Sequence, residues 1–202
     1  MGKELDNMLS GKLYHAGIDP IAREAGARAR RLSRTFNQTT EFDRELRTKL
    51  LKELFKATGE KIYIEPPFHT DYGIHTTIGE NFYANYDCIF LDVAPITIGN
   101  NVLCGPRVGI YTAGHPVDAE IRNSGLEYGY PIVIGDNVWI GGNTVINPGV
   151  TIGNNVVIGS GSVVTKDLPD NVIAVGNPCH VLRPITKEDQ IYWQKEKERR
   201  EN

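Results

Sequence analysis

The chain has 202 residues, of which 40% are hydrophobic and 23% are charged, and its formal net charge is −3. This length is enough for a single domain with a sizeable core, and the slightly acidic balance offers no basic surface for nucleic acid. Because no apolar targeting segment opens the chain and no apolar run is long enough to cross a bilayer, we expect a cytoplasmic protein without membrane contacts.

Residues 1–60 are predicted to be helical and to cap the fold that follows. Asp19 before Pro20 is typical of a helix start, with aspartate as N-cap and proline in the first turn, and this helix should run to about Phe36. Thr40 and Asp43 are spaced as a capping box for a second helix. The apolar stripe of that helix consists of Leu46, Leu50, Leu51, Leu54 and Phe55.

Residues 61–184 carry a six-residue repeat, which is strictest over residues 134–166. Every sixth residue there is a β-branched aliphatic: Ile134, Ile140, Ile146, Ile152, Ile158 and Val164. A smaller side chain follows four residues after each of the first five: Val138, Thr144, Val150, Val156 and Ser162. Neither an α-helix nor a simple strand has this period, whereas a triangular solenoid of short parallel strands does. We therefore predict a mainly β fold, a parallel β-helix with the aliphatic side chains inside.

The residue after each aliphatic is predicted to turn the corner of a coil. It is glycine at Gly135, Gly141, Gly153 and Gly159, and asparagine at Asn147. Both residue types tolerate the positive φ that a tight corner demands.

The repeat lapses over residues 112–131, an excursion rich in polar residues and glycine. Long loops mounted on a rigid scaffold are usually functional, so we expect the chemistry here. After the repeat, residues 185–202 are predicted to form a short, charged C-terminal helix or tail, with Thr186 and Asp189 as its cap. The unpaired spacing of Cys88, Cys104 and Cys179 favours small buried side chains over a disulfide or metal site.

His115, at the start of the excursion between Gly114 and Pro116, is the candidate general base. An imidazole that takes the proton of an attacking hydroxyl contributes about 10²–10⁴ in rate. A turn histidine that binds a backbone carbonyl explains the position equally well. The sequence has no Gly-x-Ser-x-Gly elbow and no Cys–His motif, which favours direct attack by an acceptor over a covalent acyl-enzyme.

The sequence resembles the maltose/galactoside O-acetyltransferases, a group of hexapeptide-repeat acyltransferases, through nearly its whole length. The resemblance rests on residues 81–88, on Gly114-His115-Pro116, on residues 137–142, 147–153 and 164–167, and on Gly176-Asn-Pro178. Leu13-Tyr14 and Asp19-Pro20 are similar to the N-terminal helical domain of that group.

The resemblance implies a homotrimer of left-handed β-helices that transfers the acetyl group of acetyl-CoA, without a metal, to a sugar hydroxyl, often the 6-OH of a hexose. It makes His115 the general base and places Asn85 beside the reacting centre, as a catalytic and acceptor-binding residue. It assigns the remaining acceptor contacts to Asp19, Asp71 and Asp92. It assigns the CoA contacts to Trp139, Gly142, Ser160, Thr165, Lys166, His180 and Arg183.

Two departures bear on specificity. Asp71 and Leu91-Asp92-Val93 resemble the maltose branch more than the galactoside branch, which tends to have serine at the first position and two adjacent acids at the second. His180 replaces an arginine that helps bind CoA in some relatives, so CoA binding is expected to depend more on Lys166 and Arg183.

Three other interpretations remain open. The first is an acetyltransferase with a different hydroxyl acceptor, such as an antibiotic or an oligosaccharide. A γ-carbonic anhydrase-like zinc protein would share the β-helix, but it needs three converging histidines. A non-catalytic β-helical assembly subunit would leave His115, Lys166 and Arg183 without a role.

Overall fold

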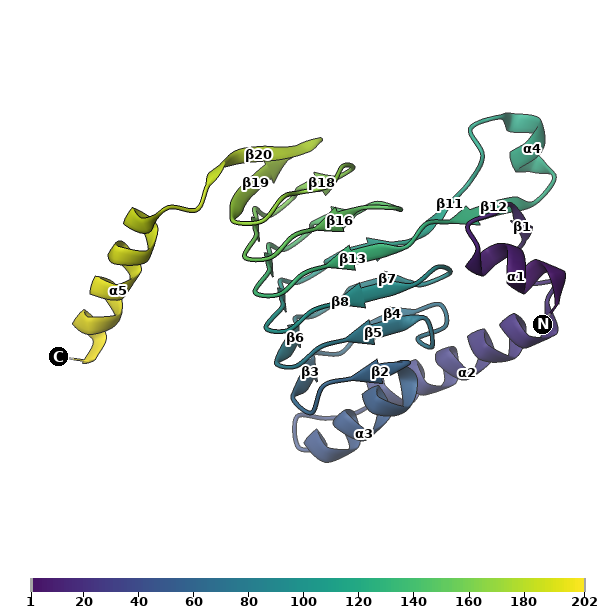
Figure 1. The fold of residues 1–202 in the computed structure, drawn as a ribbon. Helices are drawn as coiled ribbons and strands as arrows, with labels where there is room; N and C mark the ends of the chain where they lie inside the picture. Colours follow the sequence, from purple (N-terminus) through teal and green to yellow (C-terminus); the bar gives the residue numbers. More distant parts are fainter. Residues whose placement is uncertain (1, 202) are drawn as a thin grey trace.

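The computed structural model describes residues 2–201 as a β-helix with helices at both ends (Figure 1). Its coils place strands on three faces, and the chain visits the first, second and third face in turn. The first face holds β2 (Ala57–Thr58), β5 (Thr76–Ile78), β8 (Ile96–Ile98), β13 (Ile132–Ile134) and β16 (Thr151–Ile152). The second holds β3 (Ile62–Ile64), β6 (Phe82–Ala84), β9 (Leu103–Cys104), β14 (Trp139–Ile140), β17 (Val157–Ile158), β19 (Val172–Gly176) and β20 (Cys179–Pro184). The third holds β4 (Phe68–Thr70), β7 (Cys88–Leu91), β10 (Gly109–Tyr111), β15 (Val145–Ile146) and β18 (Val163–Val164).

The predicted period matches the core. Each predicted inward aliphatic from Ile134 to Val164 is at most 1% exposed, and the smaller residue four places later is buried in every repeat. Neighbouring coils are parallel and in register, for example Ile96 opposite Ile132. The interior is therefore one continuous apolar column, which also takes in the three unpaired cysteines.

The corner glycines do not have the positive φ that was predicted for them. Positive φ occurs three residues after the inward aliphatic, as at Asn137, Asn143 and Asn155, and not at the glycine that follows it directly. That glycine is needed because the coils stack closely: a Cβ on Gly135 would lie 2.8 Å from the backbone of Gly153 in the next coil. Two different corner positions thus carry two different constraints.

The N-terminal helices are α1 (Lys3–Leu9), α2 (Pro20–Asn37) and α3 (Arg44–Leu54). The helices α2 and α3 close the first coil, whereas α1 lies to the side, next to the excursion (Figure 1). The Asp19 side chain caps α2, as predicted. Thr40 does not cap α3, because the helix begins at Arg44 and Thr40 instead donates its N–H and hydroxyl to the carboxylate of Asp43.

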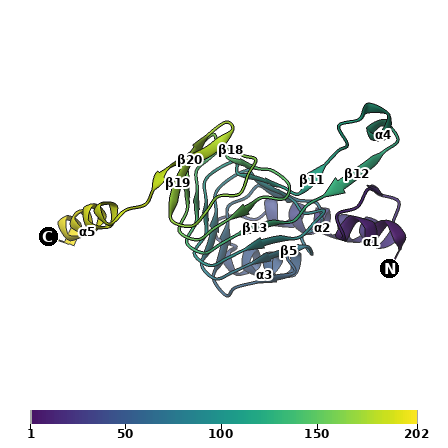
Figure 2. The same ribbon diagram turned by 45° about the horizontal axis from the view of Figure 1, so that its top comes forward.

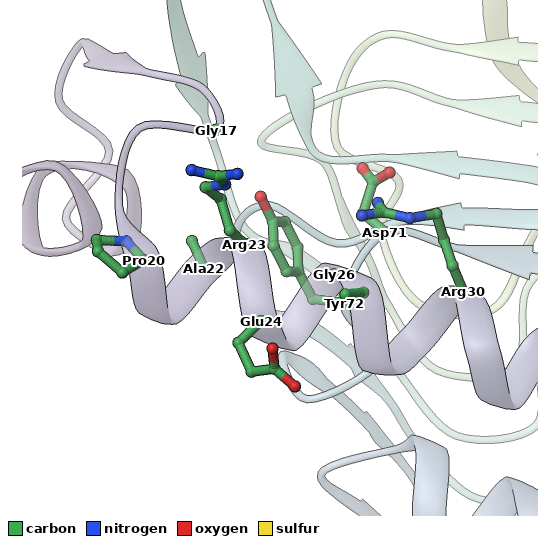
Figure 3. Close-up of a pocket in the computed structure, with 10 residues that line it drawn as sticks. Gly17, Pro20, Ala22, Arg23, Glu24, Gly26, Arg30, Asp71 and Tyr72 are labelled. Carbon is green, nitrogen blue, oxygen red and sulfur yellow. The ribbon is translucent and has the colours of Figure 1, made fainter.

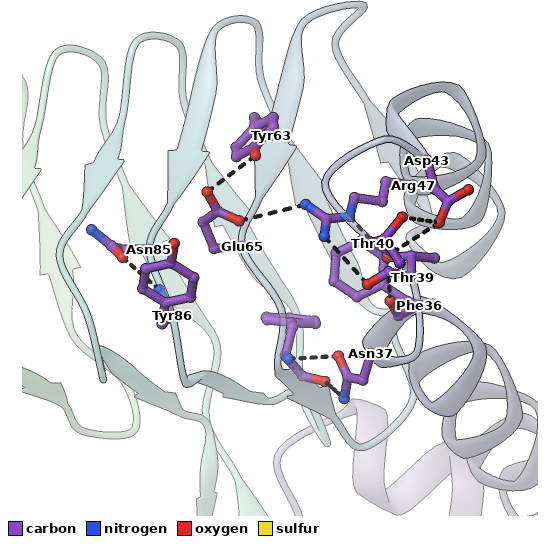
Figure 4. A network of polar contacts seen from close by, with 11 residues as sticks. Phe36, Asn37, Thr39, Thr40, Asp43, Arg47, Tyr63, Glu65, Asn85 and Tyr86 are labelled. Carbon is purple, nitrogen blue, oxygen red and sulfur yellow. Dashed lines mark hydrogen bonds and ion pairs between the residues drawn. The ribbon is translucent and has the colours of Figure 1, made fainter.

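Buried polar contacts attach this cap to the solenoid (Figure 4). The Asn37 amide both donates to the carbonyl of Phe68 and accepts from its N–H, at 3.0 and 2.8 Å, so it pairs with β4 like a strand neighbour. Arg47, only 7% exposed, donates from Nε to Thr39 Oγ1 and lies 3.5 Å from the carboxylate of Glu65.

The excursion is ordered. It contains β11 (Ala113–Gly114), a short helix α4 (Ala119–Asn123) and β12 (Leu126–Gly129). β12 lies at the centre of a small antiparallel sheet, between β11 and β1 (Tyr14–His15) of the N-terminal segment. The excursion and the N-terminal segment therefore form one unit at the edge between the third and first faces (Figure 2).

The C-terminal helix α5 (Lys187–Glu201) begins with the predicted capping box, in which Thr186 and Asp189 exchange hydrogen bonds. It has no buried residue and extends away from the solenoid (Figure 2). None of the helices within residues 2–201 combines the length and apolarity needed to cross a membrane.

The two corner constraints predict that the same substitution costs different amounts of stability at the two positions. Gly135→Asn should lower the free energy of unfolding by about 3 kcal/mol, because any side chain there meets the next coil. Gly149→Asn should cost less than about 1 kcal/mol, because asparagine tolerates the φ of +82° and its Cβ would have ordinary contacts, at 3.4 Å from Tyr130. Urea unfolding of both variants measures the difference; equal losses would contradict this division of roles.

Candidate active site

The predicted site residues divide between two edges of the prism. His115, Asp71 and Asp92 lie where the third face turns into the first, whereas Asn85, Gly142 and Ser160 lie where the second face turns into the third. A third-face strand such as β7 separates the two edges. At about 3.3 Å per residue, the distance between the edges is roughly 15 Å. One chain therefore does not bring His115 and Asn85 together.

His115 follows β11 directly and faces Glu127 on β12. Its Nε2 is 3.9 Å from Glu127 Oε1, and the other oxygen of that carboxylate, Oε2, accepts a hydrogen bond of 3.0 Å from the Tyr14 hydroxyl. Glu127 is thus held between an imidazole and a phenol. This distance is too long for a hydrogen bond, so the carboxylate acts on the imidazole through its charge, which stabilises the protonated form.

Sequence reasoning missed Glu127. No motif in the sequence distinguishes it from the other acidic residues of the excursion, and only the pairing of β11 with β12 places it beside His115. Gly114 pairs with Tyr128, so extending that register by one residue sets His115 opposite Glu127. An antiparallel hairpin within residues 112–131 would have been the signal.

Asp71 lines an open pocket of about 480 Å³ beside α2 (Figure 3). The guanidinium groups of Arg23 and Arg30, seven residues apart on α2, flank this pocket, and Gly26 between them leaves it unobstructed. Burial, helped by the charges of Asp92 and Glu127, raises the pKa of Asp71 to about 6. Arg30 opposes that shift. A carboxylate facing arginines is suited to binding the hydroxyl groups of a polyol.

The carboxylate of Asp92, which the resemblance assigns to the acceptor, is buried within the single chain. Its side chain is 0% exposed and fully hydrogen-bonded within the loop from residue 70 to residue 76. The donors are the hydroxyls of Thr70 and Thr76 and the N–H groups of Tyr72, Gly73 and His75. Asp92 therefore organises the loop that carries Asp71.

Asp19 is 6% exposed, and its Oδ1 accepts from the N–H groups of Ile21 and Ala22. It lies at the start of α2, beside Tyr14 and Tyr72, and so borders the same region as the Asp71 pocket. Its clearest task is to fix the N-terminus of α2.

The second edge is different in character. Asn85 is half-buried, and its Oδ1 accepts from the N–H of Tyr86 (Figure 4). Trp139 projects from the second face and is 55% exposed. Gly142 and the exposed Ser160 occupy successive corners above Asn85. This edge presents an aromatic surface and backbone groups, and the charged residues Asp87 and Arg107 are exposed at its corners.

The other predicted CoA residues lie higher in the solenoid. Thr165 and Lys166 are exposed and follow β18, and His180 lies on β20 with its Nδ1 3.2 Å from the carbonyl of Pro178. Arg183 forms a bidentate ion pair with Asp189 at 2.6 and 2.8 Å, which raises the pKa of the guanidinium. Arg183 is therefore engaged at the start of α5 rather than free for a phosphate.

Within residues 2–201, no three His, Cys, Asp or Glu side chains converge as a metal site would require. The zinc interpretation therefore has no ligand set in one chain.

Comparison with known proteins gives matches over most of the chain. The family described as the maltose acetyltransferase hexapeptide capping motif matches residues 7–59, and the bacterial transferase hexapeptide (six repeats) matches residues 131–166. The galactoside O-acetyltransferase of Escherichia coli is 45% identical over 95% of this chain and 94% of its own length.

Two solved structures extend the similarity to the fold. A maltose O-acetyltransferase from Clostridium difficile 630 has 54% identity and a TM-score of 0.90, over 92% of this chain and 99% of the other. A galactoside acetyltransferase in complex with coenzyme A has 44% identity and a TM-score of 0.91, over 94% of each chain.

The raised pKa of Asp71 predicts a pH-dependent effect of Asp71→Asn. The folded state keeps this proton up to about pH 6, whereas an unfolded aspartate loses it near 3.8, so ionising Asp71 destabilises the wild type as pH rises through that window. Asp71→Asn should therefore be more stable than wild type at pH 7.5, by about 1–2 kcal/mol after allowance for partial exposure. This gain should be lost by pH 3.5. Urea unfolding at both pH values measures it, and a difference that does not change with pH would contradict the assignment.

Proposed function

The chain belongs to the maltose/galactoside O-acetyltransferase family, and on that premise we propose that it acetylates a sugar hydroxyl with His115 as general base. It is an acetyltransferase, and homologous structures contain coenzyme A or acetyl-CoA, so acetyl-CoA is the donor. The acceptor we propose is maltose, glucose or a galactoside, at the 6-OH. The observation that carries the proposal is the carboxylate of Glu127 facing the imidazole of His115.

The reaction needs no covalent enzyme intermediate. A ring nitrogen of His115 takes the proton of the acceptor hydroxyl while its oxygen attacks the acetyl carbonyl carbon. The C–S bond of the resulting tetrahedral intermediate then breaks, and the leaving CoA sulfur recovers the proton from His115. Glu127, next to Nε2, favours the charged imidazolium that exists between these two transfers, and leaves Nδ1 to exchange the proton.

The acceptor is proposed to occupy the pocket between α2 and Asp71. The Asp71 carboxylate accepts hydrogen bonds from sugar hydroxyls, and the guanidinium of Arg30 on the same wall donates to them. Asp19 contributes by fixing the start of α2 and the border of this pocket. Aspartate at position 71, as in the maltose branch, favours a glucoside such as maltose. A different hydroxyl acceptor, such as an antibiotic or an oligosaccharide, is the second candidate, because the pocket is open to solvent.

The complete site is proposed to form between protomers of a homotrimer. One protomer supplies His115, and its neighbour supplies Asn85 to hold the acceptor or the imidazole, because these residues lie on different edges of a single chain. The surface of the second face supports this. Its aligned outward residues are mainly aromatic or aliphatic: Tyr63, Tyr83, Leu103, Trp139, Val157 and Ile173. The first face aligns Ala57, Thr77, Thr97, Val133 and Thr151 instead, a surface better suited to water.

Acetyl-CoA is proposed to lie in the same junction. Its pantetheine passes Trp139, Gly142 and Ser160, which offer an aromatic ring and backbone groups, and its phosphates lie near Thr165 and Lys166. His180 and Arg183 lie toward the same end of the solenoid. Arg183 joins the phosphates only if it leaves Asp189, so we assign the main charge contact to Lys166.

Release of CoA thiol tests the activity directly. With acetyl-CoA and a panel of maltose, glucose, thiogalactosides and chloramphenicol, wild type should release thiol only when an acceptor is present. His115→Ala should lose about 10²–10⁴ in kcat, and Glu127→Gln should lose less. Release that survives His115→Ala would reject the base, and no release with any acceptor would reject the function.

Complementation tests the shared site. His115→Ala and Asn85→Ala, each inactive alone, should regain activity when they are unfolded and refolded together. Random assembly of a trimer leaves about a quarter of the junctions with both functional residues, so about a quarter of wild-type activity is expected. Each variant refolded alone is the control. Absence of recovery, with trimers formed, would show that a single chain holds the whole site.

A further inference from the structure

The N-terminal segment contributes a side chain to the row of residues that ends at His115. The small sheet orders its strands β1, β12, β11, and each supplies one member: Tyr14, Glu127 and His115. Tyr14 pairs directly with Glu127 in the β1–β12 register, and His115 is the next position after the Gly114–Tyr128 pair on the other side. Residues opposite one another in antiparallel strands have their side chains on the same face, so the three side chains form one line across the sheet.

The contacts along this line have a direction. The Tyr14 hydroxyl donates to Glu127 Oε2 at 3.0 Å, which leaves Oε1 as the oxygen that faces His115 Nε2. Burial and the charge of Glu127 raise the pKa of Tyr14 above its ordinary value, so the hydroxyl keeps its proton and remains a donor at neutral pH. The bond therefore occupies one oxygen of Glu127 permanently and limits rotation of its carboxylate.

Tyr14 itself is held firmly. It is 2% exposed, and its ring packs in a small cluster with Leu5, Met8, Ala22 and Val93. The backbone of the next residue, His15, donates to Glu4 Oε2 at 2.6 Å, which ties β1 to α1. Because the ring of Tyr14 is already fixed, its hydroxyl loses no mobility when it binds the partly exposed Glu127, and the bond can hold that carboxylate in place.

We propose that Tyr14 is a positioning residue for the acetyl transfer: its hydroxyl fixes Glu127, and Glu127 in turn orients the imidazole of His115. The inference rests on the proposed function for its catalytic consequence. It gives the N-terminal segment a part in the reaction besides closing the end of the solenoid.

Tyr14→Phe is the direct test, because it removes the hydroxyl and keeps the buried ring. We expect kcat to fall about 2–10-fold, the effect of one hydrogen bond, while KM for acetyl-CoA and for the acceptor stays unchanged. In a Glu127→Gln background the same substitution should have little further effect, because its target is already altered. Tyr192→Phe is the control, since it removes a hydroxyl from a tyrosine that is 56% exposed on α5, away from the proposed site. It should leave kcat as in wild type.

Each kinetic outcome is decisive. A kcat equal to that of wild type in Tyr14→Phe would overturn the proposal, and so would an equal loss in both backgrounds, which would mean that Tyr14 acts through packing alone. A fall in kcat that is accompanied by a rise in KM would also overturn it.

A spectroscopic readout separates this inference from the function itself. The ring C–H signals of His115, assigned by their absence from His115→Ala, should shift in Tyr14→Phe and Glu127→Gln and stay in place in Tyr192→Phe. If wild type releases no thiol with any acceptor but these signals shift, the function fails and the coupling from Tyr14 to His115 stands. Signals that do not move in Tyr14→Phe overturn the coupling whatever the activity.

Discussion

Close stacking of the coils is the constraint on which the rest of the structure depends. Parallel strands in register require the backbone of each coil to lie directly over the one below, and at corners such as Gly99, Gly135 and Gly153 the contact is too close for a Cβ. The inward aliphatic residues fill the column that this stacking creates, and every strand is hydrogen-bonded to its counterparts. The result is a rigid surface along which edge positions repeat predictably.

The chemistry that we propose for His115 is located where this constraint is relaxed. After β10 the chain leaves the repeat, and β13 resumes it opposite β8, so the excursion interrupts the coil without changing the register. The excursion is not a free loop, because β12 pairs with the N-terminal β1. The position of His115 is thus determined from two sides, by the solenoid through β10 and by the helical cap through β1. Precise orientation of a catalytic side chain needs support of this kind.

The sequence predicted the periodic part well, because in a solenoid each residue repeats the environment of the residue one coil away. Ile134 to Val164 could be placed inside, and Asp19 at the start of α2, from local patterns alone. The corner glycines were predicted with the wrong cause, since the distance between coils is not visible in one hexapeptide. The hydrogen-bond partners of Glu127 and Asp92 could not be predicted for a related reason. These partners, Tyr14 and the loop from residue 70 to residue 76, are distant in sequence. Arg183 was expected to be available for CoA, because its pairing with Asp189 depends on where α5 begins.

Asp71 and Asp92 show how the same residue type acquires two tasks at one edge. Asp92 receives hydrogen bonds from five donors, so both of its oxygens are occupied and it has nothing left to offer a ligand. Burial of Asp71 raises its pKa, and the nearby charges of Asp92 and Glu127 raise it further. The positive charge of Arg30 opposes this shift. A carboxylate in this condition is incompletely satisfied in the free protein, and hydroxyl donors from an acceptor would supply what it lacks. Asp92 therefore shapes the loop, and Asp71 is the aspartate that we propose to bind the acceptor.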